Sequence, residues 1–379
     1  MKKRILCVLA VLLTFIFSLQ VAFAQERNSS TQKLNNQKTA LENADRIEKS
    51  IFGNRALESS YAGVYLNKDG NLVVNYTGED NIIQNRVTAN DTIYKKVSNN
   101  LQTLNDANEK FQGLVGKYGI ESVELSIKNN CVIVTYKNDA DLEFLNSLFD
   151  AEAVQFKKSI PNMGFQFTTN VINGNSGGLT SGSNSFTIGC RAKSSSTGKA
   201  GVLIPGHIFP DTDTDVYYNG GSSVMGTTKQ TQCSGKVDAT FVQTKSSYKP
   251  TLDFADGDSY EYTSVDTGKY GLREGLTVHL HGSYSGKTEG EILSTSFTAN
   301  VGGISMTNLV KCDYVSEGGD SGGAVTYDRY IGSATSRVSV MGLQSLRFVP
   351  DSGTWTPGSS FSCFSRIDYI YSALNLTDY

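Results

Sequence analysis

Short stretches in which apolar and polar residues alternate follow one another through the second half of the chain. They span residues 185–192, 201–205, 237–243, 276–280, 291–297, 306–314, 322–326 and 338–343. Alternation with a period of two predicts β-strands with one buried face, and many short strands in series predict a sandwich or barrels. Ile367, Ile370 and Leu374 recur at helical spacing. We therefore expect an all-β domain over residues 171–379 that ends in a helix.

The first half of the chain has a different pattern, in which helical periodicity alternates with hairpin signals. Apolar residues at helical spacing predict one helix over 41–51 and another over 93–114. Turn residues between apolar runs predict hairpins over 61–76 and 123–137. A short helix over 141–149 completes an α+β region, which we place at residues 25–170.

Residues 161–182 are expected to connect the two halves. They are polar and contain several glycine and asparagine residues. Such exposed segments are where proteases cut chains, so this stretch is interpreted as an interdomain linker.

The N-terminus has the pattern of a secretory signal peptide. Lys2, Lys3 and Arg4 precede an apolar run over 5–21, and small residues at Ala22 and Ala24 suit a signal peptidase. We expect residues 1–24 to be removed and the mature product to be soluble, secreted and extracellular. A membrane anchor is the alternative, but the apolar run is short for a span.

Composition narrows the choice of partners. The chain has 379 residues, of which 39% are hydrophobic and 19% charged, with a formal net charge of -3. This is enough apolar material for a packed core and too little charge for a disordered chain. A slightly acidic balance argues against a nucleic-acid or anionic-membrane partner, because either would require a basic face.

Four cysteines remain in the predicted β domain, an even number that predicts two disulfides in an exported protein. Of the three pairings, we favour Cys190–Cys233 and Cys312–Cys363. Neither a CxxC pair nor a close Cys/His cluster occurs, so we expect no zinc site and no other metal.

The sharpest motif is Gly-Gly-Asp-Ser-Gly-Gly at residues 318–323. A serine hydroxyl needs a base to become a nucleophile, and glycine lets backbone N–H groups approach a developing oxyanion. Ser321 is therefore the candidate nucleophile. The alternative is a glycine-rich turn without chemistry.

The candidate base is His207, one of three histidines in the chain. It follows an apolar run that ends in Pro205-Gly, which places its imidazole where a strand meets a loop. His279 and His281 share one strand-like run. The alternative is a structural role for His207. The presence of the motif around Ser321, which needs a base, disfavours this alternative.

The candidate acid is Asp238, which lies inside an apolar strand-like run. A buried carboxylate is costly unless it is paired and hydrogen-bonded, and a histidine that becomes charged suits it. The other candidates lie in polar clusters and are less favoured: Asp211, Asp213, Asp215, Asp253, Asp256 and Asp258.

The chain resembles the secreted bacterial trypsin-fold serine proteases of the alpha-lytic protease and streptogrisin group. The similarity is carried by residues 186–193, by Pro205-Gly-His207, by the glycine spacing within 278–290, by the motif around Ser321 and by 342–345. The hairpin over 61–76 resembles the pro-region of that group. Residues before 170 match loosely and those around Ser321 strongly.

The resemblance implies two antiparallel β-barrels with a triad of His207, Asp238 and Ser321 between them. It implies an oxyanion hole formed by the N–H groups of Gly319 and Ser321. Gly342 and Ser345 would lie in the strand that pairs with substrate, with Ser345 touching the aspartate. Residues 25–170 would be a pro-region that assists folding and blocks the cleft.

Several positions depart from the family pattern. Pro205 stands next to the glycine before His207, and Ile208 replaces a cysteine, which leaves Cys190 without its family partner. Ser283 stands where an arginine would pair with Asp320. Leu346-Arg347 replaces two glycines after Ser345, and this change narrows or recharges the substrate groove.

We therefore expect a secreted serine endopeptidase made as a zymogen, a monomer that acts on polypeptide substrates without a cofactor. The alternative is a catalytically inactive binding or adhesion module that kept the fold. The identity of the preferred substrate residue is not predicted.

Overall fold

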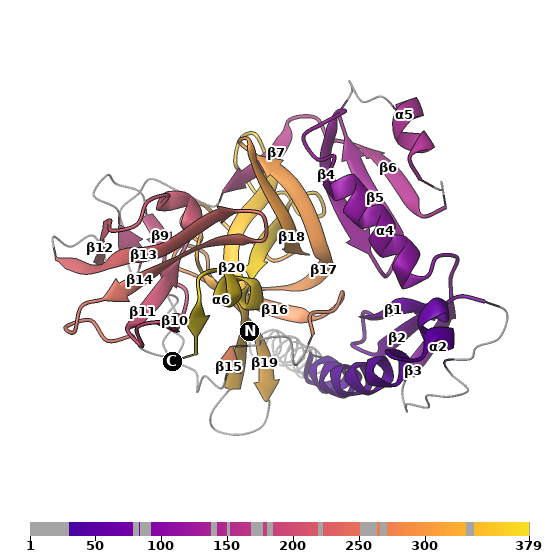
Figure 1. Cartoon of the computed structure of the whole chain (residues 1–379), viewed down its shortest axis with the longest axis horizontal. Coiled ribbons are helices and arrows are strands. Elements are labelled where there is room, and N and C mark those ends of the chain that lie inside the picture. Colours follow the sequence, from indigo (N-terminus) through magenta and orange to yellow (C-terminus); the bar gives the residue numbers. More distant parts are fainter. Residues whose placement is uncertain are drawn as a thin grey trace, which may run out of the picture.

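The structure is a computed structural model of the chain (Figure 1). It describes residues 30–78, 83, 92–137, 142–149, 152–167, 177–179, 185–218, 223–250, 264–265, 271–330 and 337–378. The predicted signal peptide and the proposed boundary at residue 170 lie outside these ranges. Among the described helices, none combines the length and the apolar character that crossing a membrane requires.

The N-terminal region begins with a helix and a small sheet. The helix covers residues 30–51, and α2 (Arg55–Ser60) follows it. The sheet has the order β1-β2-β3, with an antiparallel hairpin followed by a parallel pair. Its strands are β1 (Tyr61–Leu66), β2 (Leu72–Tyr76) and β3 (Thr92–Lys96). The predicted helix over 41–51 and the hairpin over 61–76 are confirmed.

The second N-terminal unit repeats this arrangement. After α4 (Leu101–Gln112), an antiparallel hairpin is again followed by a parallel strand. The elements are β4 (Ile120–Ser126), β5 (Cys131–Tyr136), α5 (Leu142–Ser147) and β6 (Val154–Lys158). The second predicted hairpin and the short helix are confirmed, whereas the sequence analysis did not detect the repeat.

The helix predicted over 93–114 begins later than expected. Ile93 lies in β3, opposite Val73 of β2, and α4 starts at Leu101. The Asn100 side chain accepts a 2.8 Å hydrogen bond from the Thr103 N–H and so caps the helix. Pairing with β2 therefore overrides the apparent helical spacing of residues 93–97.

Six strands of the C-terminal region form a closed barrel. Their order is β16-β19-β20-β21-β18-β17, and β17 pairs back with β16, all antiparallel. The strands are β16 (Thr277–Gly282), β17 (Gly286–Val301), β18 (Ile304–Cys312), β19 (Ala324–Tyr330), β20 (Arg337–Pro350) and β21 (Phe361–Arg366). The short strand β15 (Ser264–Val265) pairs in parallel with β20.

A second antiparallel sheet has the order β22-β10-β11-β14-β13-β12-β8-β9 and folds around its own core. Its strands are β8 (Gly177–Leu179), β9 (Ser185–Thr187), β10 (Arg191–Ser194), β11 (Ala200–Ile204), β12 (Asp215–Tyr218), β13 (Val224–Ser234), β14 (Val237–Thr244) and β22 (Leu376–Thr377). Helix α6 (Ile367–Ala373) lies near the C-terminus. The predicted fold class, an α+β region followed by two antiparallel β units with a C-terminal helix, is confirmed.

The N-terminal region packs on the barrel through strands and through a shared core (Figure 1). β4 pairs with β17, and β7 (Met163–Phe167) pairs with β20. One apolar cluster joins Ile47 and Ile51 of the first helix to Leu276 and Val310 of the barrel. The stretch 161–182, predicted as a linker, therefore contains a strand of the barrel sheet.

The predicted disulfides are wrong, because Cys190, Cys233, Cys312 and Cys363 are all free thiols. Cys312 lies opposite Ser362 on the neighbouring strand, so Cys363 is offset by one residue. A one-residue offset places the two side chains on opposite faces of the sheet, where they join different apolar clusters. Cys190 and Cys233 also belong to different clusters. Burial raises the pKa of all four thiols, and the charge and hydrogen bond of Asp238 add to the rise at Cys233.

Candidate active site

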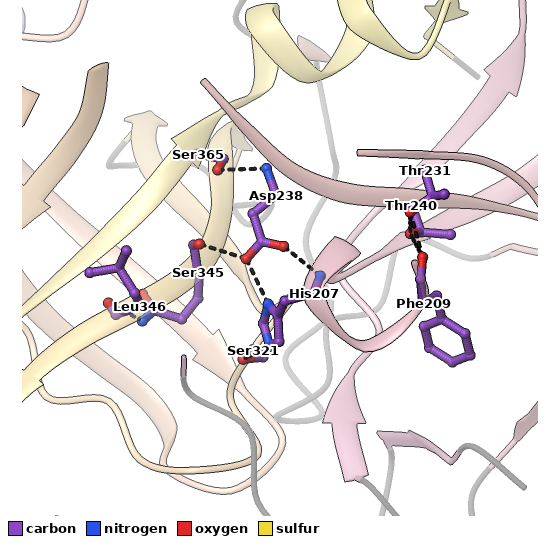
Figure 2. A network of polar contacts seen from close by, with 10 residues as sticks. His207, Phe209, Thr231, Asp238, Thr240, Ser321, Ser345, Leu346 and Ser365 are labelled. Carbon is purple, nitrogen blue, oxygen red and sulfur yellow. Dashed lines mark hydrogen bonds and ion pairs between the residues drawn. The ribbon is translucent and has the colours of Figure 1, made fainter. Parts of the chain in front are cut away.

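The imidazole of His207 lies where the two sheets meet. His207 belongs to a single 3-10 turn, η1 (Gly206–Ile208), that directly follows β11 and Pro205. The turn breaks the strand, so the side chain leaves the sheet and points toward β14 and the loop before β19 (Figure 2). The predicted strand-to-loop position of His207 is therefore present.

Asp238 of β14 is fully buried and lies next to His207. One carboxylate oxygen, Oδ2, is 2.7 Å from His207 Nδ1, and the other accepts a 2.8 Å hydrogen bond from the His207 backbone N–H. Ser345 Oγ donates to Oδ2 at 2.6 Å. Burial alone would raise the pKa of Asp238, but the charge and hydrogen bonds of His207 and the Ser345 bond outweigh it and lower the pKa. The carboxylate is therefore held ionised and in a fixed orientation.

Ser321 completes this chain of contacts from the opposite barrel. Its Oγ lies 3.0 Å from His207 Nε2 in the loop between β18 and β19 (Figure 2). Gly319 and Gly322 on either side have φ of +104° and +86°, a region that side-chain-bearing residues rarely adopt. A Cβ on Gly322 would also lie 2.5 Å from Pro205 Cδ. Pro205 thus packs against the loop that carries Ser321.

Asp320, whose charge partner the sequence did not predict, is held by backbone groups. It is fully buried, and Oδ1 accepts hydrogen bonds from the N–H groups of Tyr284 and Ser285, each at 3.0 Å. Oδ2 accepts from the Glu317 N–H at 2.8 Å. The sequence has Ser283 where the resemblance leads one to expect an arginine partner for Asp320. Three backbone N–H groups bind the Asp320 carboxylate instead, and they fix the loop that carries Ser321.

The backbone around Gly319 is held by polar contacts. The Gly319 carbonyl accepts from Thr187 Oγ1 at 2.8 Å and from Ser283 Oγ at 3.3 Å. The Thr187 N–H donates to the Ser321 carbonyl at 2.8 Å. These contacts order the segment whose Gly319 and Ser321 N–H groups are predicted to form the oxyanion hole, and that role stays a prediction.

Two further predicted residues lie on β20. Ser345 contacts Asp238, as described above, and stands immediately before the stretch that pairs with β7. Gly342 lies within the sheet between Val325 and Arg366. A Cβ there would be 2.2 Å from the Ser365 carbonyl oxygen, so Gly342 allows close packing of β20 and β21.

The remaining histidines and acids are placed elsewhere. His281 Nε2 contacts Thr326 Oγ1 of β19, and His279 Nε2 contacts Glu289 of β17. Asp213, in the loop before β12, pairs with Lys229 of β13. The cluster over 253–258 lies outside the described residues. Within the described ranges, no three His, Cys, Asp or Glu side chains are close enough to hold a metal ion.

The sequence analysis missed Phe167, which covers the site. Its ring stacks on the His207 imidazole with centroids 4.4 Å apart and planes 18° apart. Ser321 is fully buried, and the His207 side chain is 5% exposed. The only available signal was the Phe-Gln-Phe pattern at residues 165–167, inside a stretch whose composition indicated a linker.

No protein-family model matches the chain, and no curated protein matches it. Among solved structures, the chain is similar to Protease A of Thermobifida fusca, with 21% identity, 55% of this chain and 97% of that chain covered, and a TM-score of 0.41. It is also similar to a glutamic acid specific serine protease, with 21% identity, coverage of 55% and 100%, and a TM-score of 0.42. A Nocardiopsis protease has 20% identity, coverage of 54% and 97%, and a TM-score of 0.41.

Proposed function

We propose that this chain is a serine endopeptidase that hydrolyses peptide bonds through an acyl-enzyme. The observation that carries the proposal is the continuous line of contacts from Ser321 Oγ through both ring nitrogens of His207 to Asp238. A buried carboxylate, an imidazole and a serine hydroxyl at these distances form the arrangement that activates a serine for acyl transfer.

In the proposed reaction, Ser321 Oγ attacks the substrate carbonyl carbon while His207 Nε2 takes the hydroxyl proton. Asp238 keeps the proton of the ring on Nδ1 and stabilises the imidazolium that forms. The N–H groups of Gly319 and Ser321 would bind the oxyanion of the tetrahedral intermediate. His207 then gives its proton to the leaving amine, and a water molecule repeats the sequence to release the acid. No metal or organic cofactor takes part in these steps.

The proposal includes synthesis as a zymogen, with residues 25–170 as the pro-region. Two observations support it: Phe167 lies on the His207 ring, and Ser321 is fully buried while β7 is in place. A substrate carbonyl has no route to a buried hydroxyl, so β7 must leave before turnover. The shared core of the first helix and the barrel supports a role for the same region in folding. Export, extracellular location and a monomeric state remain part of the proposal.

The test is labelling of the purified protein with a fluorophosphonate probe, which reacts with activated serines. The wild-type chain, once processed, should be labelled and should cleave casein, whereas Ser321→Ala should lose both by a factor of at least about 10⁴. Ser360→Ala, which removes a hydroxyl that accepts a hydrogen bond from the Thr356 N–H, is the matched control and should label normally. Equal thermal unfolding of the three proteins shows that they are folded. A Ser321→Ala chain that is still labelled, or a wild-type chain that never is, contradicts the proposal.

A further inference from the structure

A buried arginine lies beside the loop that carries the candidate nucleophile. Arg347 is two residues after Ser345 on β20 and is 8% exposed. Its Nη1 donates to the Ser316 carbonyl at 3.2 Å and to Glu317 Oε2 at 2.6 Å. Because the Glu317 N–H also holds Asp320, the guanidinium sits against the chain segment that leads directly to Ser321.

The hydrogen bonds of this guanidinium to the described residues come from one of its three nitrogens. Both contacts are made by Nη1, and Nε is buried without a hydrogen-bond partner in the described part of the chain. A guanidinium has five N–H donors, and two parallel donors match the two oxygens of a carboxylate. A buried donor without an acceptor is costly, so the Nε edge of Arg347 is suited to an anionic group that the described residues do not supply.

β7 shows how an extended peptide lies along β20. The two strands are antiparallel, with Phe167 opposite Leu346 and Gln166 opposite Arg347. Paired residues share a face of a sheet and successive residues alternate, so Phe167 and Leu346 lie on one face and Gln166 and Arg347 on the other. The packing of Leu346 with both Phe165 and Phe167 agrees with this assignment.

The same alternation places the side chain of a bound substrate. A peptide residue opposite Ser345 would directly follow the position of Phe167, whose ring lies on His207. Its carbonyl is then the one nearest the triad, so this residue is P1, the residue whose carbonyl Ser321 attacks. By the two-residue period, the P1 side chain lies on the face of Arg347.

We propose that Arg347 selects substrates with glutamate or aspartate at P1 by binding the substrate carboxylate through its Nε edge. The proposal rests on the proposed peptidase function. Glu317 holds Nη1 and fixes the guanidinium in this orientation, while the Nε edge receives the substrate. The alternative is that Arg347 and Glu317 form a purely structural pair that fills the same space.

The test uses protein expressed as the full chain and processed, with active sites counted by fluorophosphonate titration. Peptides that differ only at P1 (Glu, Asp, Gln, Asn, Leu and Ala) are compared by kcat/KM. The wild type should prefer Glu over Gln by about 10- to 100-fold, the range of a charged hydrogen-bonded pair. Arg347→Gln should bring this ratio close to one, and Arg347→Lys should keep part of it. The Glu/Gln ratio is taken within each variant, so a change in the number of labelled active sites does not affect it.

Arg366→Gln is the matched control. Arg366, at the end of the neighbouring strand β21, is also a partly buried arginine, and it pairs with the carboxylate of Asp368 in α6. This variant should keep the Glu preference. A wild-type preference for Leu or Ala, or a Glu preference that survives in Arg347→Gln, overturns the role of Arg347. Absence of labelling, or labelling without cleavage of any peptide, instead contradicts the proposed peptidase function.

Discussion

The N-terminal region adds a strand to the C-terminal barrel at two edges, and the two strands meet different partners. β4 pairs with β17 through residues 122–125, and β7 pairs with β20 through residues 163–167. Both pairs are antiparallel and both extend the barrel sheet. They differ in what they reach, because β7 ends at Phe167, whose ring lies on His207, whereas β4 pairs with residues 296–299 of β17.

The side chains at the two edges differ as well. At the β4 edge the contacts are polar: Glu124 pairs with Lys311 at 2.7 Å, and Asn108 Nδ2 donates to Ser296 Oγ at 3.0 Å. At the β7 edge they are aromatic, with Phe165 and Phe348 centroids 4.8 Å apart. The polar edge attaches the N-terminal region to the barrel, and the aromatic edge covers the triad. Attachment and coverage should therefore respond separately to mutation and to pH.

The largest expected effect is a pH dependence of attachment that depends on Glu274. Its carboxylate accepts hydrogen bonds from the N–H groups of Ile127 (2.6 Å) and Lys128 (2.8 Å), at the turn between β4 and β5. Burial raises the pKa of Glu274 from 4.5 to about 8, although these two N–H groups oppose the shift and the charge of Glu124 adds to it. Between these two pH values, Glu274 is protonated while the N-terminal region is attached to the barrel, and it loses this proton when the region detaches and Glu274 meets water. Attachment should therefore weaken as pH rises from about 5 to about 8, by roughly 4 kcal/mol, and change little above that.

Trp355 provides the measurement, because it is the one tryptophan of the sequence and lines a cavity of about 600 Å³ together with Lys157 and Ile160 of the N-terminal region. The full Ser321→Ala chain is unfolded in urea and followed by Trp355 fluorescence. The first transition, in which the N-terminal region leaves the barrel, should have a lower urea midpoint at pH 8 than at pH 5. Glu274→Gln should remove most of this difference, and Glu143→Gln, at an exposed position, should not. A difference that persists in Glu274→Gln would assign the pH dependence to other groups.

The second effect concerns coverage. Phe167→Ala removes the ring that lies on His207 and should let β7 leave β20 more often, so the unprocessed chain should react faster with a fluorophosphonate. Truncating a half-buried aromatic ring is worth about 2 kcal/mol, which corresponds to a roughly 30-fold increase in labelling rate. The rate is read from the full-length band on a gel, so processed molecules do not contribute.

Phe156→Ala is the matched control for this experiment. Phe156 is an aromatic residue of the same region, but it packs on Phe111 within the N-terminal unit. Its truncation should leave the labelling rate nearly unchanged. If the unprocessed wild-type chain were labelled as fast as the processed one, β7 would not cover the site.

The three residues of the proposed triad could be selected from the sequence because the chemistry restricts them. Only three histidines occur, and only His207 follows an apolar run that ends in a turn, beside a serine motif with few alternative functions. Asp238 could be chosen because a carboxylate inside an apolar strand needs a partner. Many strands of the two sheets were also predictable, since their alternation reflects burial on one face, which is a local property of the sequence. The strands β12, β13 and β21 were not among the predicted stretches.

The features that could not be predicted depend on contacts between distant segments. All five residues of β7 are half-buried, so no alternation indicates a strand, and only the free edge of β20 makes it one. Ile93 has helical spacing with later residues but pairs with β2. The cysteine pairing was wrong because it depends on register: one residue of offset places Cys312 and Cys363 on opposite faces. Arg347 was noted only as a change of charge, because its partner Glu317 lies in another loop.

The smallest expected effect sharpens the contrast between the two edges. Glu124→Gln removes the charge that pairs with Lys311, at a site where both side chains are mostly buried. Lys311 keeps its position over the Phe361 ring, 4.3 Å from the centroid, so the loss should be only about 1 kcal/mol. The first urea midpoint reported by Trp355 should fall slightly, while fluorophosphonate labelling of the unprocessed chain should stay within twofold of wild type. Phe167→Ala should show the reverse, with faster labelling and a smaller change in the midpoint. If Glu124→Gln accelerated labelling as strongly as Phe167→Ala, loosening β4 would by itself release β7, and the N-terminal region would cover the triad only as a single rigid unit.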